Sequence, residues 1–178
     1  MSGVTIRPAT PEDYPAVGEL TVAAYRADGL LADGHPYQEV LADVAGRAAA
    51  GDLLVATGPD GQVIGAVLLV LSGSAYAEVA RPGEAEFRTL AVAPSAQRQG
   101  VGELLVRACV DLATRRGCTA LVLSARDIAA AAHRLYARLG FVRMPERDWS
   151  PRPDIHLLAL RLDLPAPQDR ADVAGGGR

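Results

Sequence analysis

The chain has 178 residues, of which 49% are hydrophobic, and this suits one domain with a sizeable core. Its net charge is -3 and no basic block stands out, which disfavours a nucleic-acid-binding protein. Neither cysteine, Cys109 or Cys118, lies in a CxxC motif or beside a histidine cluster, so we expect buried thiols and no metal site. With no signal pattern and no apolar run of membrane-spanning length, a cytoplasmic protein is expected.

The first third of the chain predicts a short strand and two helices. Residues 4–7 are expected to form the strand, and Thr10, followed by Pro11 and two acids, is typical of a helix start. A loop at 28–36 separates this helix from a second one, expected from Tyr37 to Ala49. Both helices repeat apolar residues at three- and four-residue spacing, which indicates one buried face on each.

A hairpin and a long loop are expected next. Residues 52–57 and 63–71 are apolar runs joined by Gly-Pro-Asp-Gly, which is a hairpin signal. Residues 72–83 contain serine, glycine and proline and are predicted to form a loop.

The stretch from Glu84 to Arg116 predicts a strand, a tight turn and a long helix. The turn follows Pro94, which cannot donate to a strand ladder. Gly100 and Gly102 stand where the helix begins. The first amides of a helix have no partner within it and carry the positive end of its dipole, so this segment is expected to bind an anion, most simply a phosphate.

Three phosphate-binding patterns are possible for this turn. A dinucleotide fingerprint needs a third glycine, where the chain has Leu105, and a P-loop needs Gly-Lys-Ser/Thr, which is absent. The remaining pattern is Gln/Arg-x-x-Gly-x-Gly/Ala after a strand that ends in Val-x-Pro. Gln97, Gly100 and Gly102 match it. A structural glycine turn that caps a core helix stays open as the alternative.

The last third of the chain alternates between strands and helices. In order, the expected elements are a strand at 119–124, a helix at 128–139, a strand at 141–144, a loop at 145–153 and a strand at 155–164. The strand at 119–124 follows a helix crossover and is therefore expected to be parallel to its predecessor. Residues 1–164 then form one mixed α/β domain with a mainly antiparallel sheet, and 165–178 a disordered tail.

Two patterns together resemble the GCN5-related N-acetyltransferase (GNAT) superfamily, over roughly residues 4–164. One is the glycine turn, and the other is Leu135-Tyr136-x-x-x-Gly140-Phe141. The resemblance implies a sheet with one splayed parallel strand pair and flanking helices. It also implies direct transfer of an acetyl group from acetyl-CoA to a primary amine in a ternary complex. The family often carries asparagine seven residues before the tyrosine, where this chain has Ala129.

The resemblance also assigns the acetyl-CoA site. A backbone amide near Leu90 or Val92 is implied to polarise the thioester carbonyl, and the amides of the glycine turn to hold the pyrophosphate. The implied cofactor-binding residues are Leu90, Ala91, Val92, Gln97, Arg98, Gln99, Gly100, Val101, Gly102 and Glu103. For Arg98, a solvated surface charge is an equally open interpretation.

Two side chains are implied to be catalytic. Glu86 is expected to act as base or through a water, on the same strand face as Val92 if no bulge intervenes. The alternative is an edge carboxylate paired with Arg88, and Glu84 is a weaker substitute for the base. Tyr136 is expected to be the acid that protonates the leaving thiolate, with a core aromatic as the alternative.

The acceptor is expected between the loop at 28–36 and the loop at 145–153. The candidate substrate-binding residues are Tyr25, Tyr37, Arg88 and Trp149, and His35, Asp148 and Arg152 are further candidates in those loops. A small-molecule amine is the first expectation, and a protein N-terminus or lysine the second. A non-catalytic acyl-CoA-binding regulatory module stays open, as does the choice between monomer and homodimer.

Overall fold

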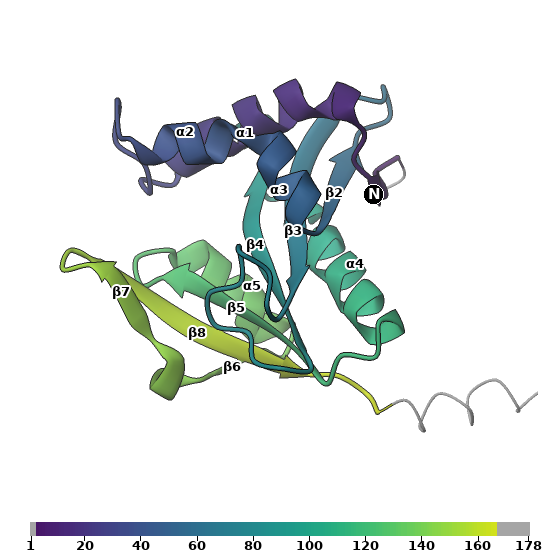
Figure 1. The fold of residues 1–178 in the computed structure, drawn as a ribbon. Helices are drawn as coiled ribbons and strands as arrows, with labels where there is room; N and C mark the ends of the chain where they lie inside the picture. The colour runs from purple at the N-terminus through teal and green to yellow at the C-terminus, as the bar shows by residue number, and fades with distance from the viewer. Residues whose placement is uncertain (1–2, 167–178) are drawn as a thin grey trace, which may run out of the picture.

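The computed structural model describes residues 3–166 and contains, within that range, one sheet of eight strands with the order β1-β2-β3-β4-β5-β8-β6, with β7 paired to β8 (Figure 1). The strands are β1 (Thr5–Pro8), β2 (Asp52–Thr57), β3 (Val63–Leu71), β4 (Glu84–Val92), β5 (Ala120–Arg126), β6 (Val142–Arg143), β7 (Trp149–Arg152) and β8 (Ile155–Asp163). The helices are α1 (Tyr14–Ala27), α2 (Tyr37–Ala42), α3 (Val44–Ala50), α4 (Val101–Arg115) and α5 (Ala130–Arg138). Most of the predicted tail lies outside the described residues.

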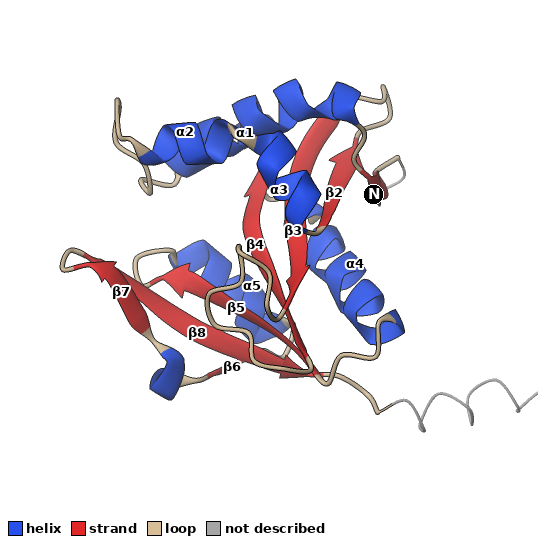
Figure 2. Cartoon of the chain, viewed as in Figure 1, coloured by secondary structure: helices blue, strands red, loops and turns tan. Residues whose placement is uncertain are grey.

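The sheet is antiparallel except where β4 meets β5, and this confirms the predicted fold class. The parallel contact is short, since it pairs only Glu84–Glu86 with Ala120–Val122. Beyond these residues β4 and β5 diverge, and the sheet opens into a V (Figure 2). The backbone of the outer half of β4 therefore has no strand partner on its β5 side.

Helices cover both faces of the sheet. On one face α4 and α5 pack on a core that includes Leu105, Leu121 and the ring of Phe87. On the other face α1 and α3 cover β2 and β3 through Val17 and Val44. None of the helices within residues 3–166 has both the length and the apolar character needed to cross a bilayer.

The structure corrects two predicted elements. The helix expected from Tyr37 to Ala49 is broken at Asp43, whose Oδ1 accepts the amide hydrogen of Gly46 at 3.0 Å and caps α3. The loop expected at 145–153 contains a 3₁₀ turn, η3 (Pro145–Arg147), and the strand β7, which closes a hairpin with β8 at the pair Arg152↔Ile155. The segment contains three prolines, Pro145, Pro151 and Pro153, a composition typical of loops.

A bulge in β4 reverses one predicted relation. Arg88 pairs with Leu68 and Ala91 with Ala66, so β4 carries one extra residue there, and Thr89 has φ 52°. Before the bulge, Glu86 points away from the α4 side, whereas Val92 packs on the α4 core after it. The two side chains were expected to share a face only if no bulge intervened, and the bulge places them on opposite faces.

Candidate active site

The turn before α4 offers a row of free backbone amides. Arg98 and Gly100 both have left-handed backbones, with φ 62° and 79°, and no side chain caps α4. Among the described residues, none of the N–H groups of 98–103 donates a hydrogen bond to the protein. Successive amides in such a turn, at a helix N-terminus, form a concave anion site. A non-glycine residue in this conformation costs free energy, and such strain is common at ligand clamps.

Gln97 joins this turn to the open side of β4. Its Nε2 donates to the carbonyl of Val92 at 3.3 Å. The next amide, that of Ala93, donates in the opposite direction, to Ile64 of β3. Because strand residues alternate in the side to which their backbone groups point, the amide of Val92 faces the V opening. It is available there as a hydrogen-bond donor.

Tyr136 lies on the α4 side of the opening and is 4% exposed. Its ring packs on those of Phe87 and Phe141, with centroid distances of 5.7 and 5.8 Å. Its hydroxyl forms no hydrogen bond within the described part of the chain, and burial raises its pKa. Tyr25 of α1 is close enough to interact with it electrostatically. Tyr136 is thus a core aromatic whose protonated hydroxyl remains a free donor.

Glu86 is fully buried and anchors the loop that precedes β4. Its Oε2 accepts the amide hydrogens of Glu78, Val79 and Ala80 at 2.9, 3.0 and 3.0 Å. Its Oε1 is buried and has no hydrogen-bond partner. The expected pairing with Arg88 does not occur, because the ion-pair partner of Arg88 is Glu78.

Removing the Glu86 carboxylate is expected to destabilise the fold. Glu86→Ala leaves three buried or partly buried amides without an acceptor, and each such group costs about 1–3 kcal/mol. We therefore expect the free energy of unfolding in urea to fall by about 3 kcal/mol or more. Glu86→Gln keeps an acceptor oxygen and should lose much less. A Glu86→Ala protein that unfolds at the wild-type urea concentration would contradict the anchoring role.

Glu84, the substitute considered for the base, is held by ion pairs. Arg147 binds its Oε2 at 2.6 Å, Arg161 binds its Oε1, and the amide of Arg81 donates to it at 2.9 Å. Burial alone would raise the pKa of Glu84, but these donors together lower it. This carboxylate therefore stabilises the loop, and its ion pairs disfavour Glu84 as the weaker substitute for Glu86 as base.

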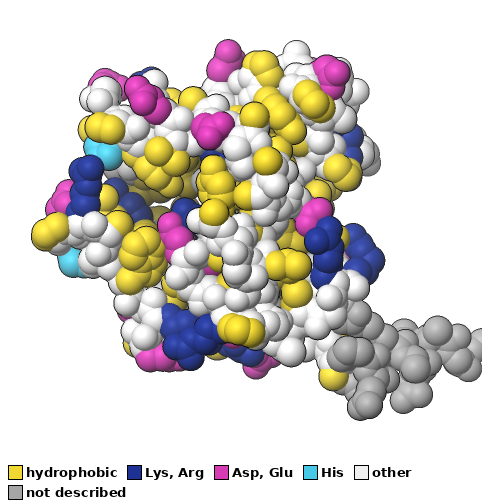
Figure 3. All heavy atoms as spheres, in the orientation of Figure 1, with side chains coloured by type: hydrophobic (Ala, Val, Ile, Leu, Met, Phe, Trp, Pro, Cys, Tyr) yellow, Lys and Arg dark blue, Asp and Glu magenta, His cyan; other side chains and the backbone are white. Residues whose placement is uncertain are grey.

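A cavity of about 220 Å³ lies on the other side of β4, between α2, α3 and the loop before β4. Residues that line it include Tyr37, Arg47, Tyr76, Glu78, Arg88 and Thr89. In the same view as Figure 1, this face of the molecule is hollowed between the helical layer and the β7–β8 hairpin, with basic and acidic side chains inside the hollow (Figure 3). The predicted residues Tyr37 and Arg88 thus meet in one cavity.

Glu78 is the carboxylate of this cavity, and the sequence had not indicated it. Its Oε1 lies 2.8 Å from Nη2 of Arg88, and its Oε2 accepts from Oγ of Ser124 at 3.4 Å. Ser124 lies on β5 two residues beyond Val122, the last residue paired with β4, so this contact joins the loop before β4 to β5 where the opening begins. Burial raises the pKa of Glu78, partly opposed by Arg88. A carboxylate with these properties is a candidate general base.

The remaining predicted acceptor residues divide between two places. Tyr25 interacts electrostatically with Tyr37 and Arg88 of the cavity but is not among the residues that line it. Trp149 does not line it: the residue lies in β7 and packs under the loop before β4, beside Val79. The two expected loops do approach each other, since Nη1 of Arg152 lies 3.4 Å from Nε2 of His35.

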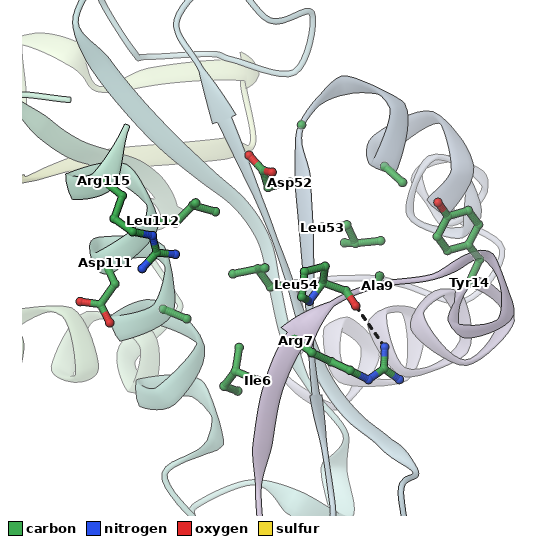
Figure 4. A pocket seen from close by; sticks show the side chains of 14 residues that line it. Ile6, Arg7, Ala9, Tyr14, Asp52, Leu53, Leu54, Asp111, Leu112 and Arg115 are labelled. Atoms are coloured by element: carbon green, nitrogen blue, oxygen red, sulfur yellow. Dashed lines mark hydrogen bonds between the residues drawn. The ribbon is translucent and has the colours of Figure 1, made fainter. Parts of the chain in front are cut away.

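A larger cavity, of about 420 Å³, lies between β1, β2 and α4 (Figure 4). Ile6, Leu54, Asp111 and Arg115 are among the residues that line it. None of the predicted site residues lines this larger cavity, and we therefore do not assign the reaction to it. Within residues 3–166 no group of three His, Cys, Asp or Glu side chains is placed to hold a metal ion.

Comparison with known proteins gives one consistent family. The model of the Acetyltransferase (GNAT) family matches residues 17–141. The chain is 35% identical over 109 residues to aminoglycoside N(6')-acetyltransferase type 1 of Klebsiella aerogenes, a match that covers 61% of this chain and 69% of that protein. It is 37% identical over 83 residues to the [ribosomal protein bS18]-alanine N-acetyltransferase of Escherichia coli strain K12, covering 46% of this chain and 56% of that protein. The structure of yncA from Salmonella typhimurium with its cofactor acetyl-CoA superposes with a TM-score of 0.67, at 25% identity, over 92% of this chain and 95% of that one.

Proposed function

Because this chain belongs to the GNAT family of acetyltransferases, we propose that it transfers the acetyl group of acetyl-CoA to the amine of a small molecule, by direct attack in a ternary complex. The observation that carries the proposal is the position of the free amides at 98–103. These amides lie at one end of the V opening between β4 and β5. Glu78 lies on the opposite face of the sheet, where it lines the smaller cavity. Acetyl-CoA supplies a thioester, and the chain must place, deprotonate and stabilise the groups around it.

The free amides hold the pyrophosphate of acetyl-CoA, and the cofactor-binding residues expected from the sequence keep that role. Gln97 fixes the turn to β4, so the anion site and the donor on β4 are set at a constant separation. The amide of Val92 donates to the thioester oxygen as negative charge develops on it. A fixed hydrogen-bond donor that points at a developing charge commonly supplies a large part of the rate enhancement.

Glu78 takes the role of base in this proposal, and Glu86 that of a positioning residue. The acceptor amine attacks only as the neutral form, so its ammonium must first lose a proton to a base. Glu78 faces the cavity, whereas Glu86 is buried and holds the backbone of Glu78 and its two neighbours. Glu86 therefore acts through the loop and has no direct part in the proton transfer.

Direct attack is favoured because neither cysteine suits an acyl carrier. Cys109 is fully buried in the α4 core, and burial raises the pKa of its thiol to about 12. Cys118 is 8% exposed, and burial raises its pKa as well. The nucleophile is then the acceptor amine, and its nitrogen bonds to the acetyl carbon as the carbon–sulfur bond breaks.

The cavity and one relative support a small acceptor. The cavity that contains Glu78 has a volume of about 220 Å³, which is smaller than the roughly 300–1,000 Å³ of pockets that hold drug-sized ligands. The Klebsiella relative is named for an aminoglycoside, which is a small-molecule amine. A protein N-terminus remains the second candidate, because the Escherichia coli relative is named for the alanine of a ribosomal protein.

Tyr136 is proposed to give its hydroxyl proton to the departing sulfur and to regain a proton released from the amine nitrogen as the amide forms. Tyr136→Phe removes the free hydroxyl and keeps the ring against Phe87 and Phe141, so we expect kcat to fall about 10- to 10³-fold. Acetyl-CoA affinity and Tm should remain near wild type. Pre-steady-state measurement of acetyl transfer is the test, since it separates chemistry from product release. A parallel loss of stability and activity would make Tyr136 a core residue alone.

A thiol-detection assay of CoA release with a panel of primary amines tests the proposed function. Enzyme-dependent release that requires both acetyl-CoA and the acceptor is the expected result. Tight acetyl-CoA binding without any acceptor-dependent release across small amines and free peptide N-termini would favour a non-catalytic acyl-CoA-binding module.

A further inference from the structure

Arg47 is a buried arginine without a counterion. It lies on α3, is 1% exposed and lines the cavity that contains Glu78. Its Nε and Nη1 atoms are buried and have no hydrogen-bond partner, and within residues 3–166 it forms no ion pair. Burial lowers its pKa. A charge taken out of water without a partner is strongly unfavourable, so an anion bound beside Arg47 would remove a large cost.

The neighbours of Arg47 do not neutralise it. Tyr25, Tyr37 and Tyr76 are phenols, and the exposed Asp43, which caps α3 through Oδ1, is the weakest of its electrostatic neighbours and forms no ion pair with it. The two other charged groups that line the cavity, Glu78 and Arg88, form an ion pair of 2.8 Å. The cavity therefore has a surplus of one positive charge, and it is located on Arg47.

A second observation marks the same cavity as a binding site. Thr89, which lines it, is β-branched and has φ 52°. A β-branched residue in the left-handed region is a true outlier, and strain of this kind is concentrated at ligand sites and active sites. The strained bulge lies in β4 between Arg88, which lines the cavity, and Val92, whose amide faces the V opening. The same short segment of β4 therefore borders both the cavity and the proposed reaction site.

We propose that this cavity binds the acceptor through a carboxylate that pairs with Arg47, and that the acceptor is therefore a small free amino acid. The inference rests on the proposed function, and it adds the class of the acceptor. A free amino acid carries an ammonium for Glu78 and a carboxylate for Arg47 on one compact molecule, which matches the two charge environments of the cavity. A polycationic amine lacks the anion, and a protein N-terminus has its α-carboxyl in a peptide bond.

The test compares L-amino acids with their carboxamides, which keep the α-amine and the size but lose the negative charge. Alanine, valine, leucine and phenylalanine are each assayed against the matching amide, with rates corrected for the fraction of neutral amine. We expect kcat/KM for the preferred amino acid to exceed that of its amide by about 30-fold or more, the scale for losing one partner of a buried charge pair.

Arg47→Met should abolish this discrimination without unfolding the protein. Replacing a buried, unpartnered charge by an apolar side chain of similar length is neutral or stabilising, so Tm should stay level or rise. Arg47→Lys keeps the charge and should restore part of the preference. Arg116→Met removes an exposed arginine that pairs with Asp52 at 2.8 Å, far from the cavity, and should behave as wild type.

A binding measurement separates failure of this inference from failure of the proposed function. Calorimetry with N-acetylated amino acids and their amides needs no turnover, and the acids should bind more tightly by a similar factor only when Arg47 is present. Equal binding of acid and amide, equal discrimination in Arg47→Met, or a preference for aminoglycosides or peptides would each overturn the inference. In the last case acetyl transfer itself would stand.

Discussion

Gly100→Glu is expected to lower acetyl-CoA affinity about 100-fold or more, because it places a negative charge where the free amides at 98–103 face a phosphate. The glutamate side chain also competes for those amides. Calorimetric titration with acetyl-CoA measures the effect, and circular dichroism checks the fold. This variant has the largest expected effect on binding because no other described group substitutes for the amides.

Gly117→Glu is the matched control for this variant. Gly117 follows the other end of α4 and has φ 76°, close to the 79° of Gly100, and no atom lies within 4 Å of a Cβ added there. Both variants therefore introduce a charge and a similar backbone strain of about 1–2 kcal/mol. Gly117→Glu should bind acetyl-CoA as wild type does. Equal affinity in both variants and wild type would show that the turn before α4 does not hold the pyrophosphate.

The elements were predictable where local chemistry and apolar spacing agreed. The hairpin of β2 and β3 forms at the predicted residues because its strands are mostly apolar and its turn is rich in glycine and proline. The break between α2 and α3 was missed because the apolar spacing continues across Asp43, while the cap depends on one side-chain bond to Gly46. Periodicity detects buried faces but does not detect a single competing hydrogen bond.

The active site was less predictable because it depends on contacts between distant segments. Glu86 is a buried carboxylate on a mostly apolar strand, where an unpaired charge would be unfavourable. Its partners are backbone amides of the loop before β4, and the sequence did not indicate them. Glu78 lies in that loop and gains its environment from Arg88 and Ser124. The bulge at Thr89 reverses which face of β4 the following side chains occupy. No glycine or other residue typical of a left-handed backbone marks this position in the sequence.

Glu78→Gln is expected to lower kcat/KM by about 10²- to 10⁴-fold, the usual range for loss of a general base. The substitution keeps the size of the side chain and an acceptor oxygen toward Arg88 but removes the ion pair, so acetyl-CoA affinity should change little while Tm falls. Glu19→Gln, on the exposed side of α1, is the matched control and should keep the wild-type rate.

The pH dependence distinguishes a base from a structural carboxylate. Burial raises the pKa of Glu78 above its ordinary value of 4.5, and a base acts only when deprotonated, so wild-type kcat/KM should fall as pH drops through this raised pKa. Glu78→Gln has no group to titrate and should lose that limb, while the limb set by the amine of the acceptor remains. If the variant keeps both limbs at a reduced rate, Glu78 acts only by holding Arg88, and the proton leaves the amine by way of water.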